Sequence, residues 1–494
     1  MESTKTKKGQ DEFGDFQTPA ALADEVVRLL AAQSLRPATI IEPTCGQGTF
    51  VHAALAHFPA AQVIGVEINP AYVAQLQQSL QGEKRATIER GDFFSVDWQT
   101  KLRQFPQPIL LLGNPPWVTN AQQTLFQSDN LPQKSNFQRQ AGIDAITGKS
   151  NFDISEWMLR QLVTLLDDRS AEIAMLCKTM VARKVLQAAW KESQRIAHAE
   201  IRQINAAEHF GVAVDACLLR CTLGGKPTTT CLTFDSLSAD APSRQLGIVD
   251  NTLVQDVAAY RRWRRLAGDS PYQWRSGVKH DCAKVMELRT AGTKLQNGLN
   301  ETVELESDYL FPMLKSSEVA GGALQPKRQM LVPQRKTADP TDQIEQIAPR
   351  TWAYLQRHGE ALDRRRSSIY RRRPRFSVFG VGDYAFAPWK VAISGFYKRL
   401  QFAVIGSAGD KPVVVDDTVY FLACQSEEEA RLLATLLHSE PAQQFYASQV
   451  FWDAKRPITV DLLKRLNLAA VAQDLGLVKE FAKFASNNRA SGDA

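Results

Sequence analysis

Residues 39–50 read Thr-Ile-Ile-Glu-Pro-Thr-Cys-Gly-Gln-Gly-Thr-Phe, a strand-like run that enters a glycine turn and then a helix-like stretch. Glycine at Gly46 and Gly48 lets the backbone turn sharply and approach a ligand with no Cβ in the way. A lone Gly-x-Gly is weak evidence, because it also begins the dinucleotide-binding fingerprint. The third glycine of that fingerprint would fall at Val51, so this turn argues against a nicotinamide cofactor.

On both sides of this turn, the first half of the chain alternates short β-rich runs with helix-like stretches. This alternation predicts an α/β fold with a doubly wound, mostly parallel sheet, whose ligands bind beyond the carboxyl ends of the strands. The predicted strands are Thr39–Glu42, Val63–Glu67, Ala86–Glu89, Ile109–Leu112, Ala171–Cys177 and Asp215–Arg220. The predicted helices are Ala20–Ala32, Phe50–His57, Pro70–Leu80 and Asp153–Leu166.

The chain of 494 residues exceeds the usual size of one domain, and Gly, Pro, Ser and Thr accumulate over residues 224–243. We therefore expect one domain over residues 1–235, a second over residues 236–440 and a helical extension over residues 441–494. Inside the first domain, residues 118–150 form a Gln/Asn/Ser-rich segment that is too long for an ordinary connection. Its length predicts either a functional or a disordered segment.

The composition is that of a soluble globular protein, with 44% hydrophobic and 23% charged residues. No apolar run reaches the roughly 18 residues that a membrane span needs, and the polar first residues lack the apolar stretch of a secretory signal. We expect a cytoplasmic protein with no membrane partner. The seven cysteines are scattered without paired Cys-x-x-Cys spacings, which predicts reduced thiols and no metal site.

The net charge of +6 is unevenly distributed along the chain. Residues 1–240 carry 23 Lys+Arg against 25 Asp+Glu, a net of −2, whereas residues 241–494 carry 36 against 28, a net of +8. A basic half joined to a nearly neutral half suggests a polyanionic partner for the basic part, although solubility alone also explains such asymmetry.

Two acidic residues follow predicted strands in the pattern expected around a nucleoside. Glu67 ends the second strand, about where a carboxylate accepts hydrogen bonds from ribose hydroxyls in this class of fold. Asp92 follows the third strand and could accept from an adenine amine while Phe93 packs on the ring. Each residue alone is more often a solvated charge or part of a turn. In order after the glycine turn, they indicate a cofactor that contains a nucleoside.

The stretch Phe16-Gln17-Thr18-Pro19 precedes the first predicted helix. It places Thr18 at the N-cap and Pro19 at the first helical position. A helix start presents free N–H groups that suit a carboxylate, such as that of a methionine moiety. The alternative is a well-capped helix that binds nothing.

The fourth predicted strand ends in Gly113-Asn114-Pro115-Pro116-Trp117, the most specific string in the chain. The two prolines fix φ near −65° and keep Asn114 out of the helical region, so this corner is stiff. Because neither proline has an N–H, the Asn114 side-chain oxygen and the Pro115 carbonyl are available as acceptors.

These two acceptors fit methyl transfer to an aromatic amine, whose lone pair is otherwise delocalised into the ring. If they bind the two amine hydrogens, the nitrogen becomes more tetrahedral and its lone pair can point at a sulfonium methyl, with no general base needed. Trp117 offers a flat face for an extruded base, because a duplex hides the adenine until the base flips. The alternative is a corner that closes a strand with a buried indole.

In this order, the Phe-x-Thr-Pro stretch, the glycine turn and the Asn-Pro-Pro-Trp corner resemble the gamma-class amino-methyltransferases of bacterial restriction-modification systems, over residues 12–222. The resemblance implies a class I methyltransferase fold with a C-terminal α+β target-recognition domain. It also implies transfer from S-adenosylmethionine to the N6 of a flipped adenine in double-stranded DNA.

The resemblance further implies a role for each matching residue. By resemblance, the cofactor is held by Phe16, Thr18, Glu42, Gly46 and Gly48 around its methionine end, Glu67 at the ribose, and Asp92, Phe93 and Phe152 at the adenine. The target base meets Asn114, Pro115, Pro116 and Trp117, with Phe210 as the candidate for the second stacking face. A buried core Phe is nearly as good an interpretation of position 210.

Residues 364–375 hold seven arginines in twelve positions, a cluster suited to DNA phosphates. The predicted DNA-binding residues are Arg364, Arg365, Arg366, Arg371, Arg372, Arg373 and Arg375. A solvated basic loop is the alternative. The short stretches 276–280, 376–383 and 455–459 resemble parts of recognition domains in this family, and the family context implies a cognate restriction endonuclease or other defence subunit as partner.

Two other functions remain open from the sequence. Related Asn-Pro-Pro-aromatic corners act on RNA bases and on glutamine amides, but the long basic second half favours a long polyanion over a protein substrate. A non-catalytic DNA-binding subunit of a defence complex is the second alternative, which intact Asn114 and Trp117 disfavour.

Overall fold

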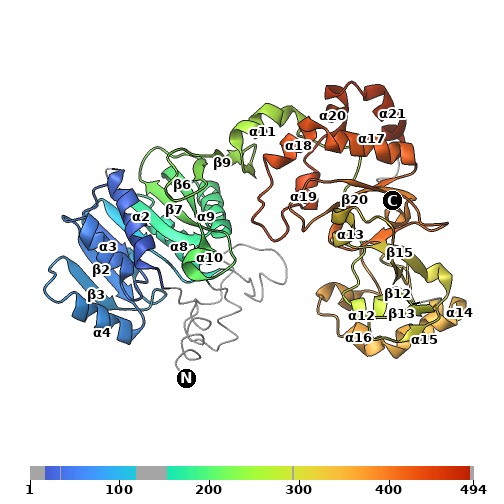
Figure 1. Cartoon of the computed structure of the whole chain (residues 1–494), viewed down its shortest axis with the longest axis horizontal. Helices are drawn as coiled ribbons and strands as arrows, with labels where there is room; N and C mark the ends of the chain where they lie inside the picture. The colour runs from blue at the N-terminus through green and yellow to red at the C-terminus, as the bar shows by residue number, and fades with distance from the viewer. Residues whose placement is uncertain (1–16, 34, 118–152, 292–293, 490–494) are drawn as a thin grey trace. The chain divides into compact units, whose positions relative to one another are not determined.

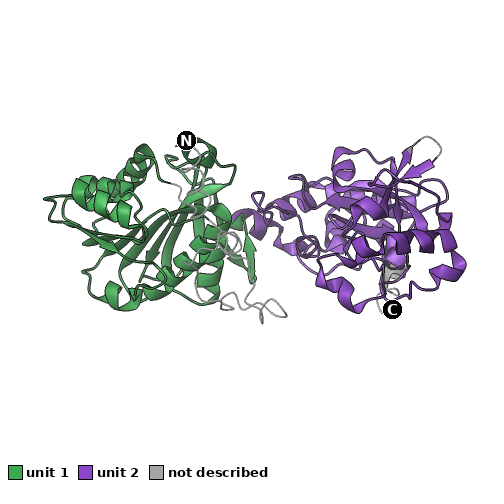
Figure 2. Ribbon diagram, turned by 90° about the horizontal axis from the view of Figure 1, so that it is seen from below, with its two compact units in different colours: residues 1–257 green, residues 258–494 purple. Residues whose placement is uncertain are grey.

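A computed structural model describes residues 17–33, 35–117, 153–291 and 294–489. The chain folds into two compact units, residues 1–257 and residues 258–494, which Figure 2 shows in green and purple. The Gln/Asn/Ser-rich segment over residues 118–150 lies outside the described residues, as do Phe16 and Phe152.

Among the described residues of the first unit, ten strands form one sheet in the order β10-β9-β8-β6-β7-β5-β4-β1-β2-β3 (Figure 1). Neighbours from β5 to β3 are parallel, and β7 runs antiparallel between β5 and β6. The predicted doubly wound, mostly parallel sheet is confirmed. The strands are β1 (Thr39–Glu42), β2 (Gln62–Glu67), β3 (Ala86–Arg90), β4 (Ile109–Gly113), β5 (Ala171–Lys178), β6 (Ile196–Ile204), β7 (Ala216–Leu223), β8 (Thr230–Phe234), β9 (Arg244–Val249) and β10 (Thr252–Val254).

Helices cover both faces of this sheet. Its central strands β1 and β4 are therefore buried on both sides. Along β4, Leu110 packs in one core and Leu111 in the other. The core that holds Leu110 includes α2 (Ala20–Ala32), α3 (Thr49–His57) and α4 (Pro70–Ser79). The core that holds Leu111 includes α5 (Trp98–Arg103), α8 (Ile154–Leu165) and α9 (Thr179–Lys191). Because helices cover both faces, a ligand can approach the sheet at the carboxyl ends of its strands.

The sequence missed β6 because its pattern is mixed: Glu200 and Arg202 are buried within it as an ion pair at 3.1 Å. The expected boundary at residue 235 also differs from the observed one. Gly224 adopts φ +81° and turns the chain into β8, which pairs with β6. Strands β9 and β10 continue the sheet, so the first unit extends to Val257.

The second unit is α+β, with two sheets among its described residues, in the orders β11-β20-β17-β18 and β14-β13-β12-β16-β15-β19. Their strands are β11 (Arg275–Ser276), β12 (Glu287–Ala291), β13 (Lys294–Gln296), β14 (Thr302–Val303), β15 (Leu310–Leu314), β16 (Arg328–Leu331), β17 (Trp389–Ser394), β18 (Ala403–Ile405), β19 (Val414–Val415) and β20 (Val419–Cys424).

The C-terminal helices belong to this second unit. Helix α17 (Glu427–His438) contacts β17, α18 (Glu440–Ala447), α20 (Leu468–Asp474) and α21 (Val478–Arg489). The extension expected over residues 441–494 therefore packs on the preceding sheet through α17, and its helical character is as expected from residue 460 onward.

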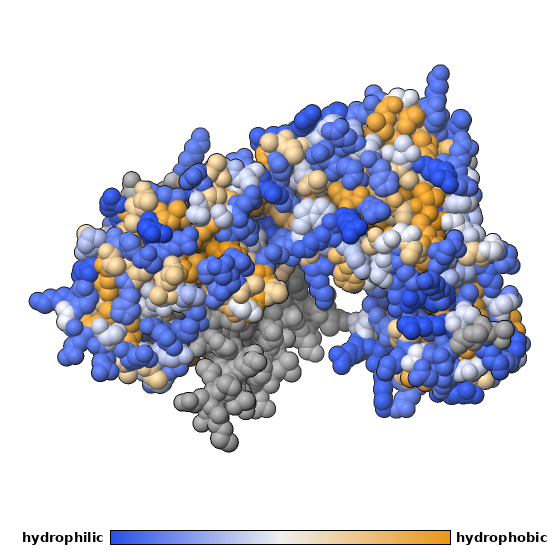
Figure 3. Space-filling view, viewed as in Figure 1, coloured by the Kyte–Doolittle hydropathy of each residue, from blue (hydrophilic) through white to orange (hydrophobic). Residues whose placement is uncertain are grey.

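On the face drawn in Figure 3, hydrophilic residues cover much of the described surface, with apolar patches between them. Within the described part of the chain, no helix combines the length and apolar character that crossing a membrane requires.

Candidate active site

The glycine turn between β1 and α3 has the backbone geometry that glycine permits. Gly46 has φ +51° and Gly48 has φ +81°. A Cβ on Gly48 would lie 2.3 Å from the Leu76 side chain of α4. Gly48 therefore shapes the turn and packs against a helix, and it does not line the cavity described below, unlike Gly46.

Glu67, at the end of β2, ties this turn to the neighbouring strand. Its carboxylate accepts from the Gly46 N–H at 2.8 Å and from the Asn69 N–H at 2.7 Å. The side chain of Gln17 reaches the same turn and accepts from the Gln47 N–H at 3.2 Å. The turn is thus held from two sides by side chains of the protein itself.

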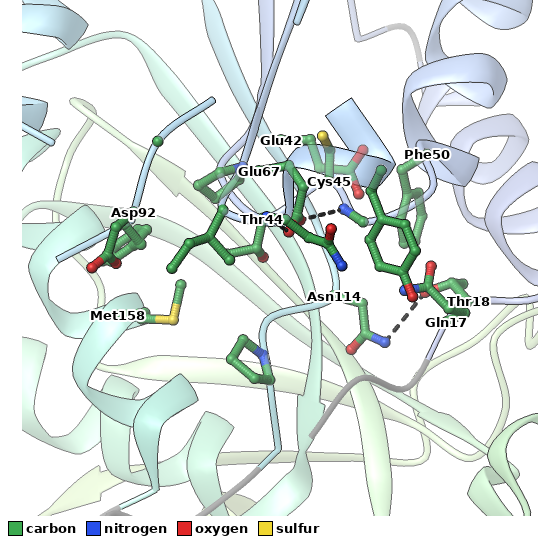
Figure 4. Close-up of a pocket in the computed structure, with 18 of the residues that line it drawn as sticks. Gln17, Thr18, Glu42, Thr44, Cys45, Phe50, Glu67, Asp92, Asn114 and Met158 are labelled. Carbon is green, nitrogen blue, oxygen red and sulfur yellow. Dashed lines mark hydrogen bonds between the residues drawn. The ribbon is translucent and has the colours of Figure 1, made fainter. Parts of the chain in front are cut away.

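A cavity of about 390 Å³ opens at the carboxyl edge of the sheet (Figure 4). Figure 4 shows Asp92 and Met158 at one end and Gln17 and Thr18 at the other, with Glu67 between them. The predicted residues that line it are Thr18, Glu42, Gly46, Glu67, Asp92, Phe93, Asn114 and Pro116. Four other predicted residues do not line the cavity: Gly48, Pro115, Trp117 and Phe210.

Further lining residues were not predicted as site residues. Among them, Ile154 and Met158 lie one helical turn apart on α8, and Tyr72 lies in the first turn of α4. The sequence position of Tyr72 could have predicted this. Helix α4 begins directly after the strand that ends at Glu67, and helices in this fold begin at the side of the sheet where ligands bind. The remaining unpredicted lining residues are Gln17, Pro43, Thr44, Cys45, Thr49, Phe50, Ile68, Asn69, Pro70, Gly91 and Phe94.

Asp92 and Phe93 reach the cavity while also serving the local fold. Asp92 accepts from the Phe94 N–H at 3.0 Å and from the Ser95 hydroxyl at 3.4 Å. The Phe93 side chain is only 5% exposed, and its ring lies 5.2 Å from that of Trp98. Phe93 is therefore mostly a core residue with one edge at the cavity.

Glu42 is the more deeply buried of the two glutamates that line the cavity, with 4% of the residue exposed against 8% for Glu67. Burial, and then the nearby Glu67 carboxylate, raise its pKa well above the usual range. Among the described residues, its Oε2 atom is buried with no hydrogen-bond partner. Burial therefore disfavours the charged form of this carboxyl group, and a cationic ligand beside it would offset that cost.

Thr18 differs from its predicted role. Helix α2 begins at Ala20, but its N-cap residue is Pro19 and no side chain caps it. The expectation that Thr18 caps the helix is wrong. Its hydroxyl instead accepts from the Asn114 side-chain amide at 3.2 Å, the dashed contact in Figure 4. This hydrogen bond therefore links the cofactor side of the cavity directly to the proline corner, Asn114–Trp117.

Trp117 and Phe210 do not flank an open slot. The Trp117 side chain is 4% exposed, and its ring lies 5.1 Å from that of Phe210 at an interplanar angle of 65°. Phe210 ends the short helix α10 (Ala206–Phe210). The expected stacking pair is thus brought together, but edge to face and in mutual contact.

The predicted arginine cluster divides into structural and exposed members. Arg365 is half-buried, donates to the carbonyls of Leu362 and Ser377 at 2.7 Å each, and lies 3.7 Å from the ring of Tyr370. Its guanidinium group therefore stabilises its own loop, and little of it is exposed for contact with a phosphate.

Two further members are neutralised by neighbours on the surface. Arg364 pairs with Glu360, and Arg375 pairs with Asp363 at 2.8 Å. The other four arginines of the cluster are exposed, and their side chains have no ion pair or hydrogen bond with any described residue: Arg366, Arg371, Arg372 and Arg373.

A curated relative, the type II methyltransferase M.NspV of Nostoc sp., is 45% identical to this chain over 473 residues. The match spans 94% of this chain and 98% of the relative. The chain belongs to the type II methyltransferase family.

Two other relatives match shorter stretches of this type II methyltransferase. M.XamI of Xanthomonas campestris pv. amaranthicola is 35% identical over 108 residues, which cover 21% of this chain and 20% of that protein. M.CvrRI of Paramecium bursaria Chlorella virus XZ-6E is 32% identical over 114 residues, which cover 23% and 27%. No family model matches the chain.

The fold of this type II methyltransferase resembles that of the type IIL restriction-modification enzyme MmeI, solved in complex with DNA. The TM-score is 0.52 at 15% identity, over 90% of this chain and 64% of the MmeI chain. The match extends through both units and confirms the class I methyltransferase fold expected for the first.

Proposed function

We propose that this type II methyltransferase transfers a methyl group from S-adenosylmethionine to the exocyclic N6 of a flipped-out adenine in DNA, as part of a restriction-modification system. One observation carries the proposal: Asn114 of the proline corner lines the same cavity as Gly46 of the glycine turn and Glu67. A methyl donor held by the turn and an amine held by the corner would therefore meet in the same cavity.

The cavity fits the proposed cofactor in size and in the chemistry of its lining. Its volume of about 390 Å³ falls in the range of small-ligand pockets, about 300–1,000 Å³. The carboxyl group of Glu42, whose Oε2 has no partner within the described chain, fits the ammonium of a methionine moiety. Glu67 would face the ribose, and Asp92 with Phe93 would face the adenine. When bound, the cofactor supplies the sulfonium methyl.

The corner's own atoms would bind and orient the amine. Because Asn114 Nδ2 donates to Thr18, the amide plane is fixed and its Oδ1 is directed away from that contact. Asn114 Oδ1 and the Pro115 carbonyl then accept the two amine hydrogens, which localises the nitrogen lone pair for attack. The nitrogen would lose one proton to solvent water only after it has gained the methyl group, so no base is needed to begin.

A target base requires the Trp117–Phe210 contact to open. A sandwiched base needs two stacking distances of about 3.5 Å each, so the rings must lie about 7 Å apart and parallel. Their present edge-to-face contact at 5.1 Å leaves no such space. We therefore propose that Phe210 moves with the short helix α10 when DNA binds, and that Trp117 then presents its face to the base.

Two features support DNA as the proposed substrate. The second unit exposes Arg366 and Arg371–Arg373, which suit phosphates. MmeI, whose fold this chain resembles over 90% of its length, was solved in complex with DNA. A cognate restriction endonuclease would be the natural functional partner of such an enzyme.

The proposal is tested by expressing the protein in a host that lacks adenine methylation and mapping N6-methyladenine by single-molecule sequencing. We expect marks at one short sequence motif with the wild type and none with Asn114→Ala. Cofactor titration of the purified variant controls for folding, because Asn114→Ala should bind within about threefold of wild type. Unmarked DNA with labelled RNA would favour an RNA methyltransferase. Cofactor binding with no transfer to either would favour a non-catalytic subunit.

A further inference from the structure

Lys178 lies beside the proline corner because β5 is longer than its neighbour β4. The pairing of the two strands ends at Gly113 and Met175, and β5 continues for three residues to Lys178. Along this overhang, β5 stays paired with β7, where Lys178 lies opposite Ala216. The backbone of Lys178 is thus fixed next to a corner that has left its own strand.

The Lys178 ammonium makes two contacts that join separate parts of the chain. Its Nζ donates to the backbone carbonyl of Trp117 at 2.9 Å and to Asp153 Oδ2 at 2.7 Å. Trp117 and Asp153 are the described residues on either side of positions 118–152. Lys178 therefore connects the end of the corner to the start of α8.

Asp153 is itself firmly placed. It is the N-cap of α8, where Oδ1 accepts from the Ser155 N–H at 3.1 Å and from the Ser155 hydroxyl at 2.5 Å. Its side chain is 7% exposed and that of Lys178 is 20% exposed. An ion pair at this depth is weakly screened, and its charge-assisted hydrogen bonds are about twice as strong as neutral ones.

The corner needs such an external support. Pro115 and Pro116 have no N–H, so the backbone there cannot donate to a neighbouring strand. On one side, Asn114 is tied to Thr18 at 3.2 Å. On the other side, the Trp117 carbonyl is tied to Lys178. The reactive acceptors therefore lie between two fixed points.

We propose that Lys178 is a positioning residue: by holding the Trp117 carbonyl against the Asp153-capped start of α8, it fixes the Asn114–Trp117 corner for methyl transfer. This inference rests on the function proposed above. Lys178 does not line the cavity and acts through the corner, and Asp153 balances its charge so that the site gains no net cation.

The test replaces Lys178 with methionine, which keeps the length of the side chain and removes both contacts. A displacement of the corner by about 1 Å is expected to lower kcat by about 10–100-fold. The KM for DNA and the Kd for S-adenosylmethionine should stay within about twofold, because the phosphate contacts and the glycine turn are unchanged. Transfer is measured as tritiated methyl incorporated into genomic DNA from a host without adenine methylation.

Lys184 provides a matched control. It pairs with Glu156 at 3.0 Å and joins α9 to α8 by the same kind of contact, away from the corner. Lys184→Met should leave kcat within about twofold of wild type. Lys178→Arg can still donate to both acceptors and should recover most of the lost kcat. Asp153→Asn keeps an oxygen to cap α8 and should lower kcat in the same direction as Lys178→Met.

The outcomes separate a positioning role from a merely structural one. A fall in kcat without a change in melting temperature, cofactor Kd or KM, together with rescue by arginine, supports the proposal. A Lys178→Met variant as active as Lys184→Met would overturn it, and so would parallel losses in stability and cofactor binding without rescue. Wild-type protein with no transfer to DNA would instead overturn the proposed function, and the positioning role with it.

Discussion

Lys390 is a buried cation in β17 of the second unit, with 1% of its side chain exposed. Its Nζ donates to the Ala387 carbonyl at 2.7 Å, and no carboxylate within the described chain pairs with it. Burial lowers the pKa of Lys390 to about 7. The folded protein therefore gives up a proton that the unfolded chain, with an ordinary lysine pKa, still binds above neutral pH.

We predict that Lys390→Met stabilises the second unit most at and below about pH 7, where the folded state must bury a charge. Between about pH 7 and pH 10 only the unfolded wild type holds this proton. The unfolding free energy of the wild type should therefore rise relative to the variant by up to about 1.4 kcal/mol per pH unit. Urea unfolding of both proteins at about pH 7 and pH 9.5 measures the difference. An advantage of the variant that does not shrink with pH would contradict the assignment.

Residue types in the sequence predicted which side chains line the cavity better than which contacts those side chains make. Asn114 and Glu67 could be named because few side chains suit an amine or a ribose at strand ends, and both line the cavity. The Thr18–Asn114 bond could not be predicted, since it joins positions 96 residues apart. Likewise, the sequence did not reveal that Arg365 is used internally while Arg372 is exposed.

At the scale of elements, the proposed chemistry depends on α10 as a movable support. This helix spans five residues, begins at the Asn205 cap and ends at Gly211 in the left-handed region. Its Phe210 ring lies edge to face against the Trp117 ring. So short a helix has little intrinsic stability and can shift at small cost.

We predict that Phe210→Ala keeps the Kd for S-adenosylmethionine but lowers kcat/KM for DNA by about 5–150-fold, the equivalent of about 1–3 kcal/mol of lost base stacking. Phe210→Tyr retains a ring and is the matched control, with activity near that of wild type. Steady-state methylation of unmethylated DNA measures both variants. If Phe210→Ala methylates DNA as fast as wild type, Phe210 is a core residue and the second stacking face lies elsewhere.

Elements with regular apolar patterns were predicted to within three residues. The strand from Thr39 to Glu42 and the helix from Ala20 to Ala32 match their observed bounds, because burial of a whole strand or one helix face leaves a clear period. Strand β6 was missed because its buried Glu200 and Arg202 satisfy one another and break that period. The accumulation of Gly, Pro, Ser and Thr over residues 224–243 suggests a domain boundary, but this stretch contains β8, which pairs with β6 and β9 of the same sheet.

At the scale of the whole molecule, the net positive charge lies in residues 241–494, which carry 36 Lys+Arg against 28 Asp+Glu. Part of this excess is neutralised locally, as in the Arg364–Glu360 and Arg375–Asp363 pairs. The exposed run Arg371–Arg373 is the part most available to phosphates.

We predict that the triple variant Arg371→Gln, Arg372→Gln, Arg373→Gln weakens DNA binding and reduces the slope of log K against log salt by up to about three. Fluorescence anisotropy of a labelled duplex across a salt series gives this slope. The matched control is Arg364→Gln with Arg375→Gln, which removes arginines that are already paired and should change the slope less. Equal slopes for the two variants and wild type would place the DNA contact on another surface.

The central claim is that the Asn114–Trp117 corner presents an adenine amine to the cavity. It is tested most directly by incubating purified protein with unmethylated DNA and tritiated S-adenosylmethionine, digesting the product and separating its nucleosides. We predict label in N6-methyldeoxyadenosine alone, and none with Asn114→Ala. Label in a methylated cytosine, or transfer by Asn114→Ala at the wild-type rate, would contradict the account.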